Sequence, residues 1–213
     1  MDNALRITEI FYSLQGETSR TGLPTVFVRL TGCPLRCGYC DTAYAFHGGS
    51  YVSIDAILSQ VAQYQPRYVC VTGGEPLAQR QALALLTALC DAGYEVSLET
   101  SGALDIAAVD SRVARVVDIK TPASGESQKN NWQNMALLTA NDELKFVIVD
   151  EADYLWAKDV LLAQQLTQRC SVLFSPVHGM DASQLADWIL RDRLPVRMQL
   201  QLHKLLWGEA KGR

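Results

Sequence analysis

The chain has 213 residues, of which 48% are hydrophobic and 20% charged, values typical of one soluble globular domain with a buried core. Its formal net charge of −4 argues against binding to nucleic acid or to an anionic membrane, and no apolar run approaches the roughly 20 residues of a membrane span. Residues 1–6 lack the basic and apolar regions of a signal peptide, so we expect a cytoplasmic protein.

Short apolar runs rich in β-forming residues alternate along the chain with longer stretches of helical spacing. This alternation predicts parallel strands joined by right-handed crossovers. Because a closed eight-stranded barrel takes roughly 250 residues, we expect an α/β fold of one domain, 1–213, that forms a partial, open TIM-like (β/α) barrel of about six parallel strands. Ser53 and Asp181 are expected helix N-caps, and Gly93 an expected helix end. The expected strands are 25–30, 67–71, 95–98, 113–119, 144–149, 172–174 and 197–202, and the expected helices are 54–64, 77–90, 130–138, 152–168 and 182–190.

Polar motifs follow most of the expected strands at their carboxyl ends. Barrel enzymes place their chemistry at this end of the strands, so we expect these motifs to meet on one face. The motifs are residues 32–33, 72–76, 99–102, 118–122, 175–178 and 203–204.

Cys33, Cys37 and Cys40 form a C-x₃-C-x₂-C run within eight residues. In a reducing compartment, clustered cysteines indicate metal or redox chemistry, and soft thiolates suit an iron–sulfur cluster. Three thiolates can hold three irons of a 4Fe–4S cluster and leave the fourth iron open. A zinc site is the alternative, but structural zinc takes four ligands and the only further candidate nearby is His47. The remaining cysteines are expected to pack as small hydrophobic residues; they are Cys70, Cys90 and Cys170.

The cysteine run, with Tyr39 directly before its last cysteine, resembles the signature of the radical S-adenosylmethionine (SAM) superfamily. The Thr-Gly-Gly-Glu-Pro segment 72–76 resembles the GGEP motif of that superfamily. The resemblance implies that SAM binds the open iron and is cleaved by one-electron reduction, with the protein positioning the cofactor.

A narrower resemblance, which runs through nearly the whole chain, is to the 7-carboxy-7-deazaguanine synthases of the queuosine pathway. Its segments are residues 10–17, 27–33, 40–42, 99–102, 118–122 and 201–204. The resemblance implies conversion of 6-carboxy-5,6,7,8-tetrahydropterin to 7-carboxy-7-deazaguanine with loss of ammonia. It also implies catalytic use of SAM, assistance by Mg²⁺, a flavodoxin- or ferredoxin-type electron donor, and a homodimer.

The same resemblance implies roles for single residues. Thr42 corresponds to a Mg²⁺ ligand, although a lone hydroxyl is a weak site without substrate oxygens and water. Residues implied to bind SAM are Gly74, Glu75, Glu99, Ser101, Asp118, Ile119, Lys120 and Ser175. The resemblance also implies that a short N-terminal segment and three later residues bind the pterin. These residues are Leu14, Gln15, Gly16, Glu17, Arg29, Thr72 and His203.

These substrate roles have a physical rationale. A pterin edge is a row of donors and acceptors that backbone groups of a Gly-containing loop and a carboxylate can match. Arg29, which lies on an expected strand, can form bidentate hydrogen bonds to the substrate carboxylate. Without the resemblance, Arg29 and Lys120 would be read as solvated charges and His203 as a structural histidine.

Residues 205–213 extend beyond the point at which some members of the family end, where their terminal carboxylate approaches the substrate. We therefore do not assign that role to this chain, and we expect the C-terminal tail to serve in dimerisation.

Two other functions compete with this interpretation. A glycyl-radical-enzyme activase shares the cysteine motif and a short partial barrel. It acts on a protein backbone, however, and has no need for segment 12–17, which the resemblance assigns to pterin binding. A non-enzymatic zinc or iron–sulfur module would bind metal without cleaving SAM.

Overall fold

The strands of the computed structural model, which describes residues 3–213, hydrogen-bond into one nine-stranded sheet in the order β3-β1-β2-β4-β5-β6-β7-β8-β9. From β2 to β9 every neighbouring pair is parallel, whereas β1 pairs antiparallel with both β2 and β3. The strands are β1 Ala4–Leu14, β2 Pro24–Leu30, β3 Ser50–Ser53, β4 Tyr68–Gly73, β5 Glu95–Thr100, β6 Ala114–Ile119, β7 Glu143–Ile148, β8 Ser171–Pro176 and β9 Arg197–Met198.

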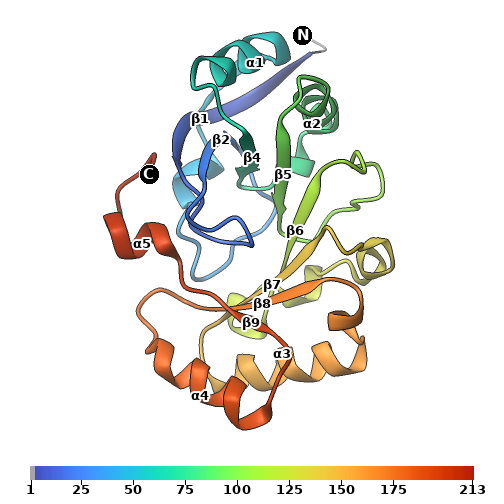
Figure 1. The fold of residues 1–213 in the computed structure, drawn as a ribbon, viewed down its shortest axis with the longest axis vertical. Coiled ribbons are helices and arrows are strands. Elements are labelled where there is room, and N and C mark those ends of the chain that lie inside the picture. Colours follow the sequence, from blue (N-terminus) through green and yellow to red (C-terminus); the bar gives the residue numbers. More distant parts are fainter. Residues whose placement is uncertain (1–2) are drawn as a thin grey trace.

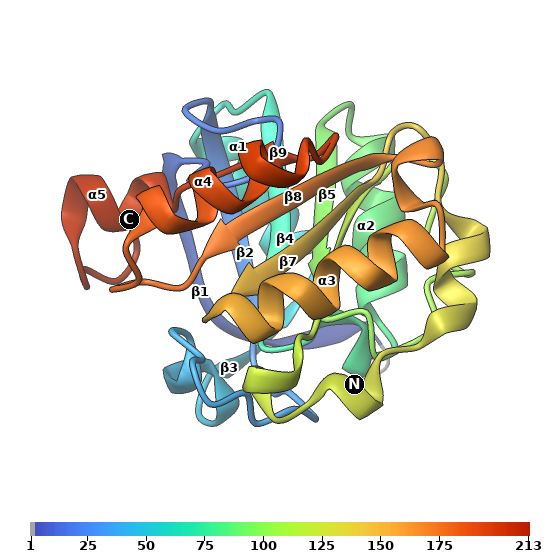
Figure 2. The same cartoon turned by 90° about the horizontal axis from the view of Figure 1, so that it is seen from below.

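Helices cover the outer face of the curved sheet (Figure 1). Figures 1 and 2 show α1 and α2 beside the first parallel strands, and α3 and α4 alongside β7 and β8. The α-helices are α1 Ile54–Gln63, α2 Ala82–Asp91, α3 Glu151–Ala163, α4 Ala182–Asp192 and α5 Leu202–Trp207. The short 3₁₀ helices are η1 Ala43–Phe46, η2 Pro76–Ala78, η3 Pro122–Ser124, η4 Ser127–Lys129, η5 Trp132–Leu137 and η6 Leu166–Gln168.

Alternation along each parallel strand separates the core from the barrel interior. In β7, Leu144, Phe146 and Ile148 are fully buried in the hydrophobic core, whereas Lys145 and Val147 line the interior cavity. The sheet does not close, because β3 and β9 remain its two edges. The predicted partial, open barrel is therefore confirmed. No helix among residues 3–213 combines the length and the apolar character needed to cross a bilayer.

The predicted capping residues of three helices are confirmed. The Ser53 side chain accepts a hydrogen bond from the Ala56 backbone N–H, and the Asp181 side chain accepts one from the Ser183 backbone N–H. Gly93 follows α2 with a φ of +87°, a conformation that favours glycine.

Three predicted elements have different bounds. The helix expected from residue 77 begins at Ala82, because Gln79 is extended and its side chain bonds the backbone of Arg6 and Thr31. The helix expected to reach 168 ends at Ala163, followed by Gln165 in the left-handed conformation. The helix expected at 130–138 is the 3₁₀ helix η5.

The strand expected at 197–202 is wrong beyond its first two residues. After β9 the Gln199 backbone N–H still donates to the Phe174 carbonyl of β8, while its side-chain oxygen accepts from the Thr18 backbone N–H. Leu202 then donates its backbone N–H to the Gly16 carbonyl and begins α5. His203 therefore lies on a helix and not at the end of a strand.

Candidate active site

A cavity inside the open barrel joins the cysteine loop to the segment that follows β1. Residues from β2, β4, β5, β6 and β7 contribute inward-facing side chains to its wall. Of the nineteen predicted site residues, those that line it are Leu14, Gln15, Gly16, Glu17, Arg29, Cys33, Cys37, Cys40, Thr42, Thr72, Gly74, Glu99, Ser101, Asp118, Lys120 and His203.

The cysteine loop is held against the loop that follows β6. The Arg36 backbone N–H donates to Glu126 Oε1 at 2.6 Å, and the Gly38 N–H donates to the Ser124 carbonyl at 3.0 Å. Burial raises the pKa of the thiols of Cys33, Cys37 and Cys40, so metal binding would have to displace their protons.

The three cysteines fit an iron–sulfur cluster. Among residues 3–213, no group of three or more Cys, His, Asp or Glu side chains is close enough together to hold a single metal ion. A cuboidal cluster does not need that convergence, because each of its irons takes one thiolate. The zinc alternative does need it, and His47, its extra ligand, is exposed and does not line the cavity.

The two glycines that follow β4 allow the chain to pack directly against the cysteine loop. Gly73 has a φ of +151°, and a Cβ atom on Gly74 would collide with the Gly32 carbonyl and Cys33 Cβ. The Glu75 backbone N–H donates to that same Gly32 carbonyl at 2.8 Å. This contact places the Gly-Gly segment beside the predicted cluster.

Glu75 itself faces away from the cavity and is fully buried. Its carboxylate accepts from the backbone N–H groups of Leu77 (2.9 Å) and Ser101 (2.7 Å). It also accepts from the hydroxyls of Thr100 (3.0 Å) and Ser101 (2.5 Å). The observed contacts of Glu75 therefore tie the end of β4 to the end of β5, and its assignment to SAM stays a prediction.

Two further predicted SAM residues do not line the cavity. Ile119 is fully buried in the hydrophobic core, and Ser175 is buried within β8. Val177 and His178, from the same predicted turn as Ser175, do line the cavity. For Ile119 and Ser175, any contact with SAM would have to use backbone atoms, and their assignment also stays a prediction.

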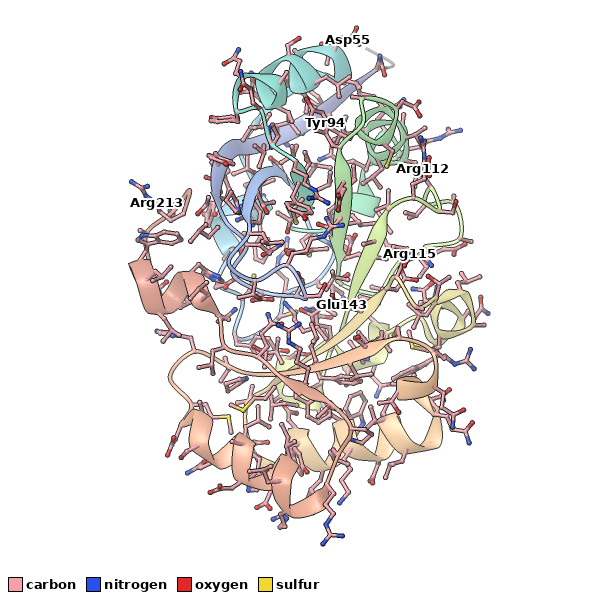
Figure 3. The ribbon with its side chains drawn as sticks, in the orientation of Figure 1. Asp55, Tyr94, Arg112, Arg115, Glu143 and Arg213 are labelled. Atoms are coloured by element: carbon pink, nitrogen blue, oxygen red, sulfur yellow. The ribbon has the colours of Figure 1, made fainter. Side chains whose placement is uncertain are left out.

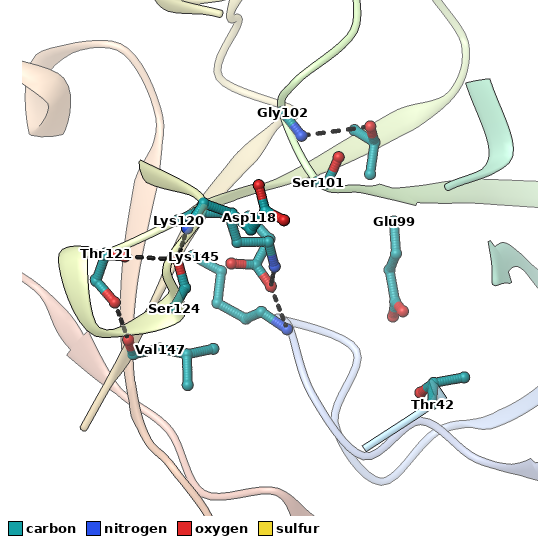
Figure 4. Close-up of polar contacts among 12 residues, drawn as sticks. Thr42, Glu99, Ser101, Gly102, Asp118, Lys120, Thr121, Ser124, Lys145 and Val147 are labelled. Atoms are coloured by element: carbon teal, nitrogen blue, oxygen red, sulfur yellow. Dashed lines mark hydrogen bonds and ion pairs between the residues drawn. The ribbon is translucent and has the colours of Figure 1, made fainter. Parts of the chain in front are cut away.

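Four charged side chains form a chain of ion pairs in the cavity, part of which is shown in Figure 4. Lys120 Nζ lies 3.1 Å from Asp118 Oδ2, and Lys145 Nζ lies 3.4 Å from the same oxygen. Lys145 also donates to Glu17 Oε2 at 2.5 Å. Asp118 Oδ1 is buried and accepts no hydrogen bond from residues 3–213. It is therefore an acceptor available to a ligand.

Glu99 connects two of the predicted substrate residues. Its Oε1 accepts from the side-chain amide of Gln15 at 3.3 Å, and its Oε2 accepts from the hydroxyl of Thr72 at 2.8 Å. These contacts place Glu99 on the substrate side of the predicted site. Its assignment to SAM rests on the resemblance alone.

Arg29 points into the cavity but already has a carboxylate partner. Its Nε donates to Glu9 Oε1 at 2.7 Å, and the hydroxyl of Tyr44 donates to the same oxygen at 2.8 Å. Burial would lower the pKa of Arg29, yet Tyr44 and Glu9 raise it above its usual value. A guanidinium has five N–H donors, and the bond to Glu9 uses the one on Nε, so Arg29 can bind a second anion.

His203, Gly16 and Thr42 border the same part of the cavity. A Cβ atom on Gly16 would collide with the imidazole of His203, so any other residue here would displace that ring. The hydroxyl of Thr42 donates to Asp41 Oδ1 at 2.7 Å. Asp41 also lines the cavity and adds a carboxylate oxygen of the kind that Mg²⁺ prefers.

The sequence interpretation missed Lys145, Gln201 and Asp41 as single residues, all of which line the cavity. A signal for Lys145 exists: a charged residue between Leu144 and Phe146 in an apolar strand must face an interior that can pair it. Arg213, labelled in Figure 3, also lines the cavity, so the tail returns to the site. In the same tail, Lys211 Nζ lies 4.5 Å from the centre of the Tyr44 ring.

Comparison with known proteins defines the class of this site. The family model of the radical SAM superfamily matches residues 27–155, which include all three cysteines, and the chain belongs to that superfamily. A 7-carboxy-7-deazaguanine synthase of Chlorobaculum tepidum is 48% identical over 98% of this chain and 97% of the relative. One of Koribacter versatilis is 44% identical over 98% of this chain and 100% of the relative. Within the superfamily, the chain is a member of the 7-carboxy-7-deazaguanine synthase family.

Solved structures agree on the fold. The crystal structure of QueE from Escherichia coli matches with a TM-score of 0.78 at 24% identity, over 94% of this chain and 95% of that one. SuiB from Streptococcus suis bound to its precursor peptide matches with a TM-score of 0.59 at 13% identity, over 80% of this chain and 46% of that one. The wider fold is thus shared with a protein that binds a peptide.

Proposed function

We propose that this chain is a carbon–nitrogen lyase that converts 6-carboxy-5,6,7,8-tetrahydropterin to 7-carboxy-7-deazaguanine with loss of ammonia. The reaction would serve the biosynthesis of queuosine, a modified tRNA nucleoside, and take place in the cytoplasm. The observation that carries the proposal is the single cavity that joins the cysteine loop to the polar segment after β1. Relatives that bear the name of this activity and span nearly the whole chain support it.

The cluster and SAM would occupy the end of the cavity beside the cysteine loop. Cys33, Cys37 and Cys40 would bind three irons of a 4Fe–4S cluster, which supplies one-electron cleavage of SAM when it is bound. Gly74 would let the chain approach the amino acid end of SAM closely, as its contact with Cys33 suggests. Further SAM contacts are proposed for Ser101, Asp118 and Lys120.

The pterin would lie deeper in the cavity, between the segment after β1 and the inward-facing side chains of the strands. Glu17 and backbone groups of residues 14–16 would pair with the donor and acceptor edge of the ring. Arg29 would bind the substrate carboxylate through N–H groups other than the Nε–H that donates to Glu9. Thr72 and His203 would border the ring from the other elements.

Mg²⁺ and the partners complete the proposal. Thr42 and its neighbour Asp41 would offer two oxygens to Mg²⁺, with substrate and water as the remaining ligands. A flavodoxin- or ferredoxin-type protein would donate the electron. A homodimer is proposed through α5, which leaves Leu205 and Leu206 exposed.

The direct test is to incubate the reduced, cluster-loaded protein anaerobically with SAM, Mg²⁺ and the carboxypterin. We expect a product with the ultraviolet spectrum and mass of 7-carboxy-7-deazaguanine. The variant Cys37→Ala should lose iron, sulfide and product together, because a cuboidal cluster needs its third thiolate. Cys90→Ala, which removes a half-buried thiol of α2, should retain all three.

The alternative activase predicts a different outcome. An activase would yield no deazaguanine but would form a glycyl radical on a partner protein, detectable by electron paramagnetic resonance. A non-enzymatic module would yield neither product nor 5′-deoxyadenosine.

A further inference from the structure

Lys145 is a partly buried cation of β7 that none of the roles proposed above uses. Its side chain is 13% exposed, and its ammonium lies on Glu17 Oε2 at 2.5 Å and near Asp118 Oδ2 at 3.4 Å. Figure 4 shows Lys145 reaching from the strand toward Asp118, with Lys120 on the other side of that carboxylate. Lys145 therefore joins the predicted substrate residue Glu17 to the predicted SAM residue Asp118.

Glu17 is held from two directions. Lys145 donates to Oε2, and the side-chain amide of Gln201 donates to Oε1 at 2.7 Å. The backbone beyond it is anchored as well, because the Thr18 N–H donates to Gln199 Oε1 and the Ser19 N–H donates to both oxygens of Glu143. Figure 3 labels Glu143, the first residue of β7. The carboxylate thus has a fixed backbone and one donor on each oxygen.

Each carboxylate oxygen can accept a second hydrogen bond. Glu17 consequently retains two acceptor positions, one on each oxygen, that match two adjacent N–H donors such as those on the aminopyrimidine edge of a pterin. We propose that Lys145 is a positioning residue that keeps Glu17 ionised and oriented as the acceptor for this donor edge. This inference rests on the proposed function.

The electrostatics support the geometry. Burial alone would raise the pKa of Glu17, but attraction and hydrogen bonds from Lys145, with a hydrogen bond from Gln201, bring it below its usual value. Repulsion from the carboxylate of Asp41 opposes this effect. Burial alone would lower the pKa of Lys145, and Glu17, Asp118 and Glu99 raise it well above its usual value. Both groups are therefore ionised at neutral pH.

Removal of Lys145 would leave Glu17 buried, with the repulsion from Asp41 no longer balanced by a cation. Its pKa would then rise, and near neutral pH the carboxyl would hold a proton where the ligand presents a donor. Raising the pH removes that proton and restores the acceptor. The signature of the proposed role is therefore a ligand affinity that becomes pH-dependent, improving with pH, only when Lys145 is absent.

The test measures binding of the carboxypterin by anaerobic calorimetry between pH 6 and 9. The protein carries its oxidised cluster and SAM, and no reductant is present, so no turnover occurs. We expect a nearly constant Kd for the parent, because Glu17 stays ionised throughout. Lys145→Met should weaken binding by about 10- to 100-fold at pH 7, the usual effect of losing hydrogen bonds to a charged group, and should recover affinity as the pH rises.

Two variants isolate the cause. Lys145→Arg keeps the cation and should keep the flat profile. The double variant Lys145→Met with Glu17→Gln should bind weakly at every pH, because the group that titrates is gone. Lys158→Met serves as the matched control, since this lysine pairs with Asp192 outside the cavity and should leave the Kd unchanged.

The inference would be overturned if Lys145→Met, with the iron content of the parent, bound the carboxypterin as tightly as the parent and with a Kd that does not change with pH. An equal loss at every pH in Lys145→Met would also overturn it, because that result indicates a merely structural role. If Lys145→Met does not retain its cluster, Lys145→Gln decides by the same pH series. Failure of the proposed function is seen separately, as a parent enzyme that makes no deazaguanine.

Discussion

The wall of the cavity carries a row of ion pairs whose charges alternate. Its order in space is Lys120, Asp118, Lys145 and Glu17. Burying one such charge alone costs several kcal/mol, a cost that falls only when an opposite charge and hydrogen bonds accompany it. Because each charged side chain has a neighbour of opposite charge, all four can stay ionised inside the cavity, away from bulk water. A substrate with its own donors and a carboxylate can then be bound by charged hydrogen bonds, which are stronger than neutral ones.

At this scale the first prediction concerns Glu17→Gln. The amide keeps the shape of the side chain but offers one acceptor in place of two, so we expect kcat/KM to fall by about 10- to 100-fold. Iron and sulfide content should stay at the parent level, because Glu17 does not contact the cysteines. Glu151→Gln, at an exposed carboxylate paired with Arg191, is the matched control. Unchanged turnover in Glu17→Gln would remove Glu17 from the site.

Most of the predicted site residues line the cavity, and the contacts that the sequence did not predict have physical causes. Lys145 was missed because a lysine in an apolar strand has no local partner in the sequence: Glu17 and Asp118 lie 128 and 27 residues away. The contacts of Glu75 were also not predicted: donors of the neighbouring strand turn its carboxylate into the interior, while its assignment to SAM stays a prediction. Neither partnership leaves a pattern in the local sequence.

At the scale of secondary-structure elements, the hydrogen bonds of Glu75 hold the end of β4 against the end of β5. We predict that Glu75→Gln lowers the free energy of unfolding of the apoprotein by about 1–3 kcal/mol, because an amide N–H₂ would face buried donors. Urea denaturation measures this change. Glu95→Gln, which removes an exposed partner of Arg67, should change stability by less than about 0.5 kcal/mol. Equal midpoints for the two variants would contradict this role of Glu75.

The parallel strands were predictable because each is an apolar run bounded by turns and followed by a helical pattern. The antiparallel strand β1 was not predicted. Its register shifts between Ile7 and Glu9, and this bulge interrupts the two-residue alternation by which a strand is recognised. The early end of β9 was also missed; the chain beyond it bonds to the loop at residues 16–18, and contacts so far apart in the sequence leave no local pattern.

For the molecule as a whole, the barrel is open between β3 and β9, and the segment after β1 reaches across to β7 and to the chain beyond β9. The C-terminal tail adds Arg213 to the cavity wall. Segments from both ends of the described chain thus complete a site that the parallel strands begin.

The proposed dimer is tested at this scale. The side chains of Leu205 and Leu206 are 68% and 50% exposed on α5, an arrangement that would be covered by a second chain. We expect light scattering after size exclusion to give twice the 23.5-kDa mass of one chain. Lysine at both positions should give the single-chain mass, whereas Leu190→Lys on α4 should not. A parent protein that is already monomeric would contradict the dimer.

The claim on which the whole account depends is that one iron of the cluster has no protein thiolate. Mössbauer spectroscopy of protein reconstituted anaerobically with ⁵⁷Fe tests it most directly. The account predicts a 4Fe–4S spectrum in which one iron in four changes when SAM is added, while the other three keep the parameters of thiolate-bound iron. Four irons that stay unchanged by SAM, or a protein that binds zinc in place of iron and sulfide, would contradict it.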